Sequence, residues 1–310
     1  MELYFIKKMK KLLFAVAAMF WALSSLSAEG VSNDKYVTKD YDLKDFTGIV
    51  ASGIYEVQLV KSNTWKVNIS VPEPLEEYLD VRVSNGKLVL AMKTVPVKIS
   101  KNYGKWNLTA KVAIPVLKSV NMSGASKLQC ADSFDLGGGT FKLEVSGASK
   151  ANGLDITARE LDMEMGGATS ASLSGVFEHA EIEMGGASKC NFEIDADRLD
   201  QEMSGAAKAY HSGEFSEVAV EASGACVFSF KGTTEKMDIE GSGAAKIESS
   251  KGSAKDVKAS ISGAAYAEIN ALENLLVEVS GGGSIRYVDN DKMELNIRSI
   301  SRGASVSKMK

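Results

Sequence analysis

Variants of the short run Ser-Gly-Ala-Ser recur through most of this 310-residue chain. Ten copies are centred on glycines that lie 18 to 23 residues apart. The central glycines are Gly124, Gly147, Gly167, Gly186, Gly205, Gly224, Gly243, Gly263, Gly281 and Gly303. A period this regular is typical of a solenoid, in which each repeat forms one coil and only the stacking of coils buries the apolar residues.

Each repeat also carries the alternation of a β-strand. In the second copy, apolar Val145, Leu143 and Phe141 lie two, four and six residues before the central glycine. Side chains with this spacing share one face of a strand, so we expect them to point into the solenoid. The pattern predicts an all-β fold, a parallel β-helix of about ten coils of 19–20 residues, and the general handedness of parallel crossovers predicts that it is right-handed.

The small residues themselves are expected at corners of the coils. Glycine accepts the positive φ angle or the crowded backbone of a tight bend, and alanine and serine leave room where one corner stacks on the next. The sequence therefore repeats because the same corner is built in every coil.

Residues 1–28 read as a secretory signal peptide. Four lysines between Lys7 and Lys11 precede an apolar stretch at residues 12–23, and small residues suited to cleavage follow. Met1 or Met9 is the start. The apolar stretch is shorter than the roughly 20 residues of a membrane-spanning helix, and no long apolar run follows it. We expect an exported mature chain without a transmembrane segment, located in the periplasm, on the outer surface or secreted.

The exported part divides by composition. All four prolines lie before residue 116, and 23 of the 28 glycines follow it. Residues 29–112 are predicted to form an N-terminal β-rich cap segment, with a hairpin turn at Asn85-Gly86. Residues 113–310 are predicted to form the parallel β-helix, because the chain after Pro115 contains no proline and can pair its strands without interruption.

Two segments together resemble the bacterial head GIN domain family of auto-transporter adhesins, which is most common in Bacteroidetes. One is "FTGIVASGIYEVQLVKSNTWKVNI" at Phe46 to Ile69, and the other is the serial "SGAS" turn at residues 123–126 and 146–149. The resemblance covers roughly residues 46–287. It implies an exported β-helical domain without an established reaction, and so it supplies no catalytic residues.

The residues that carry chemistry are few and scattered. Cys130, Cys190 and Cys226 fall in different coils, too far apart for disulfides, and are expected to be buried free thiols. The alternative is an exposed Cys226, which is the best candidate for intermolecular pairing. His179 and His211 occupy different positions in their coils, which disfavours a zinc site or a catalytic triad. We predict no catalytic, cofactor-binding or metal-ligating residues and no cofactor.

Two surface features remain as candidate binding sites. Seven glutamates lie three residues before central glycines: Glu144, Glu164, Glu183, Glu202, Glu221, Glu240 and Glu278. Five lysines lie three residues after central glycines: Lys127, Lys150, Lys189, Lys208 and Lys246. These are expected to form outward columns, either a solvated charged face or a binding face for a cationic partner, a divalent ion or a glycan. Trp65, Tyr103 and Trp106 form a candidate aromatic platform for sugars, or pack in the cap.

Charge excludes one class of partner. Removal of residues 1–28 leaves 32 basic and 39 acidic residues (36 − 4 and 40 − 1), a net charge of −7, which argues against nucleic acid as a binding partner.

The sequence favours an exported, non-enzymatic, adhesin-like protein that presents flat faces to a surface glycan or protein, with weak calcium binding along the glutamates. The alternatives are a polysaccharide-active lyase or hydrolase and a structural envelope protein that assembles end to end. The oligomeric state is left open.

Overall fold

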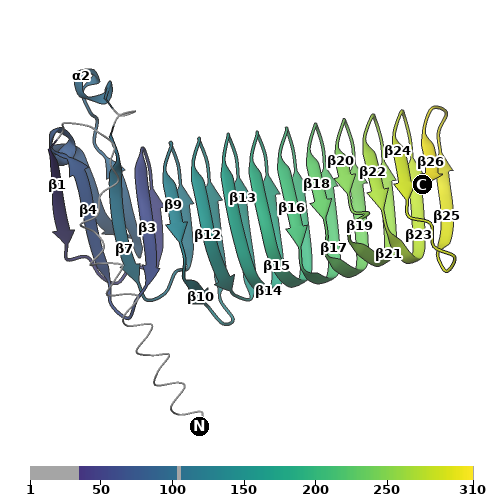
Figure 1. The fold of residues 1–310 in the computed structure, drawn as a ribbon, viewed down its shortest axis with the longest axis horizontal. Helices are drawn as coiled ribbons and strands as arrows, with labels where there is room; N and C mark the ends of the chain where they lie inside the picture. Colours follow the sequence, from purple (N-terminus) through teal and green to yellow (C-terminus); the bar gives the residue numbers. More distant parts are fainter. Residues whose placement is uncertain (1–34, 103–105, 310) are drawn as a thin grey trace, which may run out of the picture. The chain divides into compact units, whose positions relative to one another are not determined.

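The computed structural model describes residues 35–102 and 106–309. The expected signal peptide and Tyr103 lie outside the described residues. The described chain is almost entirely β-strand, and its strands stack one after another along a single axis from β3 to β26 (Figure 1).

Two series of strands build the stack. The strands that lead into the corners are β2 (Gly48–Ala51), β8 (Ser119–Met122), β11 (Thr140–Val145), β13 (Glu160–Met165), β17 (Glu214–Ala222), β19 (Thr233–Gly241), β21 (Ser253–Ile261), β23 (Ala271–Val279) and β25 (Glu294–Ile300). The strands that leave the corners are β3 (Tyr55–Lys61), β9 (Lys127–Cys130), β12 (Lys150–Thr157), β16 (Lys208–Ser212), β18 (Val227–Phe230), β20 (Lys246–Glu248), β22 (Tyr266–Ile269), β24 (Ser284–Tyr287) and β26 (Ser305–Lys308). β14 (Ser170–Met184) and β15 (Lys189–Met203) leave one corner and run on to the next.

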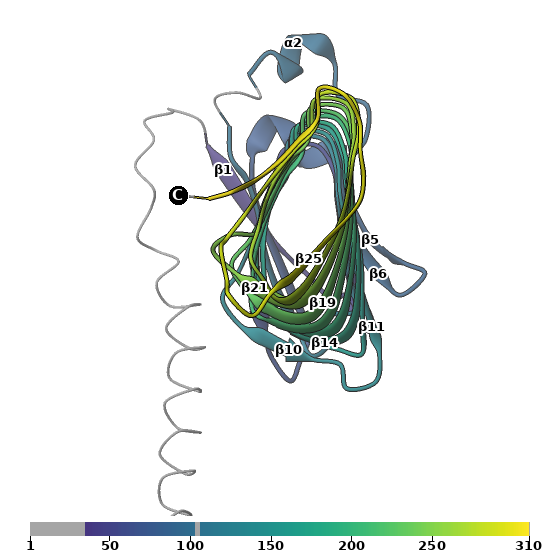
Figure 2. The same cartoon turned by 90° about the vertical axis from the view of Figure 1, so that its right-hand side faces the viewer.

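Every coil pairs in parallel with its neighbours, and the coils superimpose when the stack is viewed end on (Figure 2). The short β10 (Ser133–Asp135) also pairs in parallel with β12. The structure therefore confirms the predicted parallel β-helix.

The corners are built as the sequence predicts. All ten central glycines have positive φ, between 65° and 95°. A Cβ atom on Gly186 would lie 2.6 Å from the carbonyl oxygen of Gly167 in the preceding coil. The same oxygen accepts a 2.7 Å hydrogen bond from the amide of Ala187. Glycine is thus required both by the backbone angle and by the close approach of successive corners.

An eleventh corner lies at Gly53, upstream of the regular repeat. Its φ is 87°, and its carbonyl oxygen accepts a 2.7 Å hydrogen bond from the amide of Ala125. The repeat count missed it because 71 residues (124 − 53) separate this corner from the one that stacks on it. The local sequence Ala51-Ser52-Gly53 carried the signal.

The core runs through the inside of the coils. The inward positions predicted from the alternation are buried: Phe141, Leu143 and Val145 are each at most 1% exposed. Cys130, Cys190 and Cys226 are also buried, and all three are free thiols. This confirms the expected buried thiols and contradicts the alternative of an exposed Cys226 available for intermolecular pairing, because its Sγ donates to the carbonyl oxygen of Ser223 at 2.7 Å.

Residues 35–114 share this core and this sheet. The elements before β8 that are not part of a coil corner are β1 (Tyr36–Tyr41), β4 (Lys66–Pro72), η2 (Glu73–Tyr78), β5 (Leu79–Ser84), β6 (Lys87–Met92), α2 (Val97–Ser100) and β7 (Leu108–Ile114). β2 and β3 pair in parallel with β8 and β9, so parallel stacking extends upstream of residue 113. β1, β4 and β5 add antiparallel pairs. The N-terminal cap remains an interpretation of this segment.

Candidate functional site: an acidic groove along the coils

The predicted glutamate column is one continuous ladder. Strand register places six glutamates of consecutive coils side by side, and the ladder then continues as Ser260, Glu278 and Ser299. The six are Glu144, Glu164, Glu183, Glu202, Glu221 and Glu240. Because stacked strands lie about 4.8 Å apart, the carboxylates repeat at that spacing along the solenoid.

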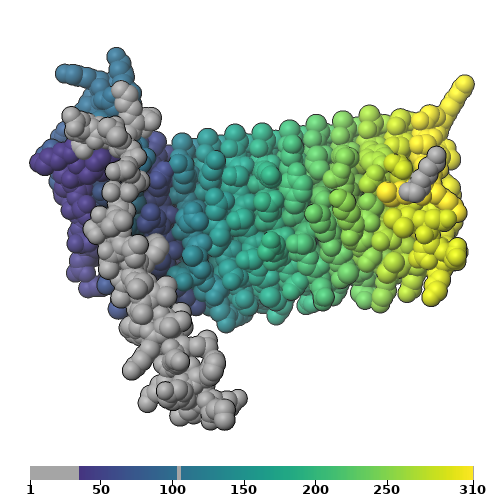
Figure 3. All heavy atoms as spheres, viewed as in Figure 1, coloured from purple at the N-terminus to yellow at the C-terminus, as the bar shows by residue number. Residues whose placement is uncertain are grey.

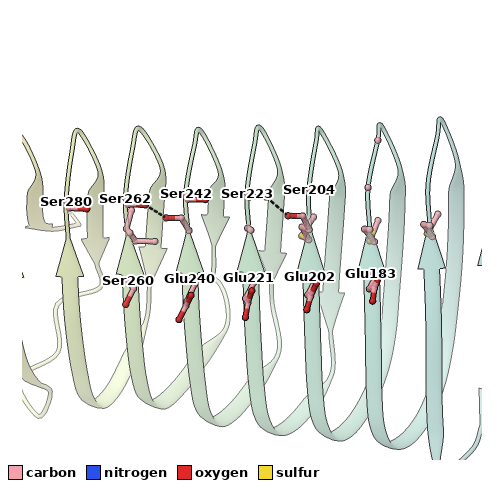
Figure 4. Close-up of a pocket in the computed structure, with 18 of the residues that line it drawn as sticks. Glu183, Glu202, Ser204, Glu221, Ser223, Glu240, Ser242, Ser260, Ser262 and Ser280 are labelled. Carbon is pink, nitrogen blue, oxygen red and sulfur yellow. Dashed lines mark hydrogen bonds between the residues drawn. The ribbon is translucent and has the colours of Figure 1, made fainter.

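A second row of polar groups runs parallel to the glutamates, one residue before each corner. Between Ser204 and Ser280 it consists of serines in every coil (Figure 4). Ser223 donates to the carbonyl oxygen of Met203 in the preceding coil at 3.4 Å, as does Ser262 to Gly241 at 3.5 Å. Each such hydroxyl keeps its acceptor capacity, because donation uses only its proton.

The two rows line a groove of about 630 Å³ that crosses many coils, from Glu164 to Ser299. We call it the acidic groove. On the face shown in Figure 3, side chains form rows that run from coil to coil. A site made of such rows offers the same groups again and again in one direction, so it suits an extended ligand better than a compact one.

The carboxylates in the middle of the column are not neutralised. Asn121 donates to Glu144, and Arg298 forms a 3.0 Å ion pair with Glu278. Within the described residues, no hydrogen bond or ion pair reaches the side chains of the five between them, Glu164, Glu183, Glu202, Glu221 and Glu240.

The neighbouring columns on the same strands behave differently. Two residues before the glutamates, the column mixes acidic, basic and apolar residues, and most of its charges are paired, as Asp162 is with Lys142 and Asp238 with Lys258. Two residues earlier again, Glu217 pairs with Arg198 at 3.1 Å. Most exposed charges in these neighbouring columns are therefore compensated, with Glu181 as an exception, whereas five successive carboxylates of the acidic groove are unpaired within the described chain.

The lysine column lies on the strands that leave the corners. Lys127 pairs with Glu56 at 2.6 Å, and Lys189 lies 5.3 Å from the ring centre of Tyr210. Among the described residues no ion pair joins this column to the glutamates. The lysines therefore do not neutralise the acidic groove.

Of the aromatic residues singled out in the sequence, Trp65 and Trp106 lie within the described chain, and both are packed against it. Trp106 is buried at 7% exposure. Trp65 is partly buried, packs against Phe46 at 6.5 Å and donates its Nε1–H to the carbonyl oxygen of Phe46 at 2.8 Å. These two rings contribute to packing, and Tyr103 lies outside the described residues.

The histidines lie apart, in different environments. His179 Nε2 lies 2.8 Å from a carboxylate oxygen of Asp200 on the surface. The pKa of Asp200 lies below its usual range, mainly because Arg198 donates hydrogen bonds to it, with a smaller contribution from His179. His211 is buried against Gln201.

In residues 35–102 and 106–309 no three His, Cys, Asp or Glu side chains form a group that could hold a metal ion. No helix of the described chain is long and apolar enough to cross a membrane.

The fold and the groove define a repetitive β-solenoid with one long, uncompensated acidic surface. A family model described as "Putative auto-transporter adhesin, head GIN domain" matches residues 45–193 and 177–290. The chain belongs to this family, as its sequence resemblance predicts.

Two solved structures have a similar fold. A putative adhesin of Parabacteroides merdae is 18% identical, with a TM-score of 0.53 over 90% of this chain and 98% of that one. A putative adhesin of Parabacteroides distasonis is 16% identical, with a TM-score of 0.51 over 89% of this chain and 98% of that one. No curated protein matches the chain. At these identities the likeness establishes the fold.

Proposed function

We propose that this chain is an exported, non-enzymatic, adhesin-like protein that binds an extended surface glycan along the acidic groove. The observation that carries the proposal is the run of five unpaired carboxylates from Glu164 to Glu240, on a face where most neighbouring charges are paired. Family membership supports the adhesin-like role.

The chemistry of the groove suits sugar hydroxyls. Each ionised glutamate accepts hydrogen bonds on two oxygens, and each serine hydroxyl of the second row accepts as well. Hydrogen bonds to a charged acceptor are roughly twice as strong as neutral ones. A polymer whose units repeat along its axis would meet an equivalent set of groups at each step of the solenoid, so many weak contacts add up in one bound chain.

A basic surface protein is the second candidate for the same groove, because unpaired carboxylates also attract lysine and arginine side chains. A polysaccharide-active enzyme would need acid and base groups with separate roles. The groove instead offers chemically equivalent glutamates in equivalent surroundings, which favours binding over hydrolysis or elimination.

A glycan array probed with the exported protein tests the proposal directly. We expect binding to one class of linear glycan and its loss in the triple variant Glu183→Gln, Glu202→Gln, Glu221→Gln, which preserves shape and removes charge. The matched control removes three exposed carboxylates outside the groove, Glu178→Gln, Glu193→Gln and Glu214→Gln. Equal loss in both variants would reduce the effect to net charge.

The competing functions give different results in the same assays. Binding to basic proteins without any glycan signal would replace the glycan by a protein partner. Release of new reducing ends from a bound polysaccharide, lost in the groove variant and kept in the control, would make the protein an enzyme and overturn the proposal.

A further inference from the structure

The last coil of the described chain has two strands with open edges. β25 pairs in parallel with β23, and β26 pairs with β24. Among residues 35–102 and 106–309, no other strand register involves either one. A row of unpaired N–H and C=O groups of this kind is a template for pairing with another chain.

The same coil leaves apolar side chains uncovered. Ile297 and Ile300 are in register with Val277 and Val279, which are at most 1% exposed because the last coil covers them. Ile297 and Ile300 themselves are 45% and 49% exposed. Inward-facing side chains of the last coil are thus about half exposed, whereas the preceding coil buries its own. Solenoids normally need a terminal repeat with a polar outer face to remain soluble.

The opposite end of the sheet is different. Its outer strands, β1 and β5, each pair in antiparallel fashion on their inner side. Leu75 of η2 and Leu79 of β5 are buried, and Lys39 of β1 is held by Glu76 of η2 at 2.6 Å. The two ends therefore do not match as surfaces, which disfavours head-to-tail growth into a filament.

We propose that β25 pairs with β25 of a second copy of this chain, which closes the open end of each solenoid in a symmetric dimer. A two-fold axis through the contact makes the two strands antiparallel. The β25 strand of each copy covers Ile297 of the other and satisfies the open edge of the partner β25. This proposal is independent of what the acidic groove binds.

The sequence of β25 is complementary to itself in this arrangement. With Asn296 on the two-fold axis, Glu294 of each copy lies opposite Arg298 of the other, and Leu295 lies opposite Ile297. Residues directly opposite in an antiparallel pair share a face of the sheet, so the charges meet outside and the apolar side chains inside. Arg298 also forms an ion pair with Glu278 of its own chain at 3.0 Å. Glu294 has no ion pair among the described residues.

Charge reversal with rescue tests the register. Sedimentation velocity of the full chain, produced with its own export segment, is measured over a dilution series. We expect a dimer for the wild type, a monomer for Glu294→Arg, and recovery of the dimer in Glu294→Arg with Arg298→Glu. Glu178→Arg, in a central coil, is the control and stays dimeric. Circular dichroism checks that each variant is folded.

A cross-link tests the geometry without weakening the contact. Residues opposite one another across an antiparallel pair have Cα atoms about 4.5–5.5 Å apart, within the range of a disulfide. Asn296→Cys should therefore give a covalent dimer on mild oxidation, whereas Glu178→Cys should not, and the native cysteines are buried. A wild type that is monomeric at every concentration, a dimer unaffected by Glu294→Arg, or polymers that lengthen with concentration would each overturn the proposal.

Discussion

His211 Nε2 lies 3.1 Å from Gln201 Oε1 inside a coil that is otherwise apolar. The amide oxygen can only accept, so His211 donates. Its ring stacks on Phe192 at 4.3 Å, and its Nδ1 has no hydrogen-bond partner among the described residues. The flanking coils place Phe192 and Phe230 at the position of His211, and Ile182 and Val220 at that of Gln201. This coil alone substitutes a polar pair for two apolar residues.

Acid should therefore weaken the fold through this histidine. Burial lowers the pKa of His211 from 6.5 to about 3. Between these values the unfolded chain binds a proton that the folded chain does not, so the free energy of unfolding falls as the pH is lowered from 6.5. The expected loss between pH 7 and pH 5 is about 2 kcal/mol, at about 1.4 kcal/mol per unit. Urea unfolding at both pH values measures it.

The control for this pH dependence is the double variant Gln201→Val with His211→Phe, which adopts the residues of the neighbouring coils. It should lose most of the difference between pH 7 and pH 5 and be at least as stable at pH 7, because the substitution removes the buried, unpaired Nδ1 of His211. An unchanged pH dependence in the double variant would assign the effect to other groups.

Adjacent glycines of one corner give the second prediction. Gly167 has φ 76°, and a Cβ atom there would lie 2.5 Å from the carbonyl oxygen of Gly147, whereas a Cβ atom on Gly166 would meet open space. Gly167→Ala should lower the free energy of unfolding by about 1–3 kcal/mol, and Gly166→Ala should change it by less than about 0.5 kcal/mol. Thermal melts of the two variants compare them, and equal shifts would contradict the assigned role of the corner glycine.

Much of the solenoid follows from the sequence because its signals are local. A positive-φ glycine and the alternation before it are both written within a few residues of each corner, so the corners and the inward positions could be predicted. The corner at Gly53 could not be found by period, because the strands between it and Gly124 interrupt the repeat. Stacking of Gly124 on Gly53 is a long-range contact that leaves no periodic trace.

The glutamate column illustrates what remains hidden in a sequence. Spacing placed the glutamates in one row, and strand register confirms this. Spacing could not tell that Glu278 is paired with Arg298 whereas Glu202 is unpaired, because side-chain partners come from adjacent coils and depend on register shifts such as the one next to Glu278. The groove formed with the serine row likewise depends on the three-dimensional path of the corner.

Export gives a prediction about the chain's N-terminus. Mass spectrometry of the protein from its native host should find a mature N-terminus between Ala28 and Gly30, since small residues follow the apolar stretch there. Detection of residues 1–27 on the soluble protein would contradict cleavage.

The charge of the acidic groove provides the last prediction. Carboxylates about 4.8 Å apart repel one another, and two like charges at 4 Å cost about 1 kcal/mol in water. Glu183→Gln, Glu202→Gln and Glu221→Gln together should raise the melting temperature at low salt, with a smaller gain at high salt where screening is stronger. The control triple Glu178→Gln, Glu193→Gln and Glu214→Gln should raise it less.

Weak calcium binding would raise the melting temperature of the wild type above that in a sodium control of equal ionic strength, and this calcium-dependent rise would disappear in the groove variant. If the groove and control triples gain equally at every salt concentration, the column carries no special repulsion and its carboxylates are ordinary solvated charges.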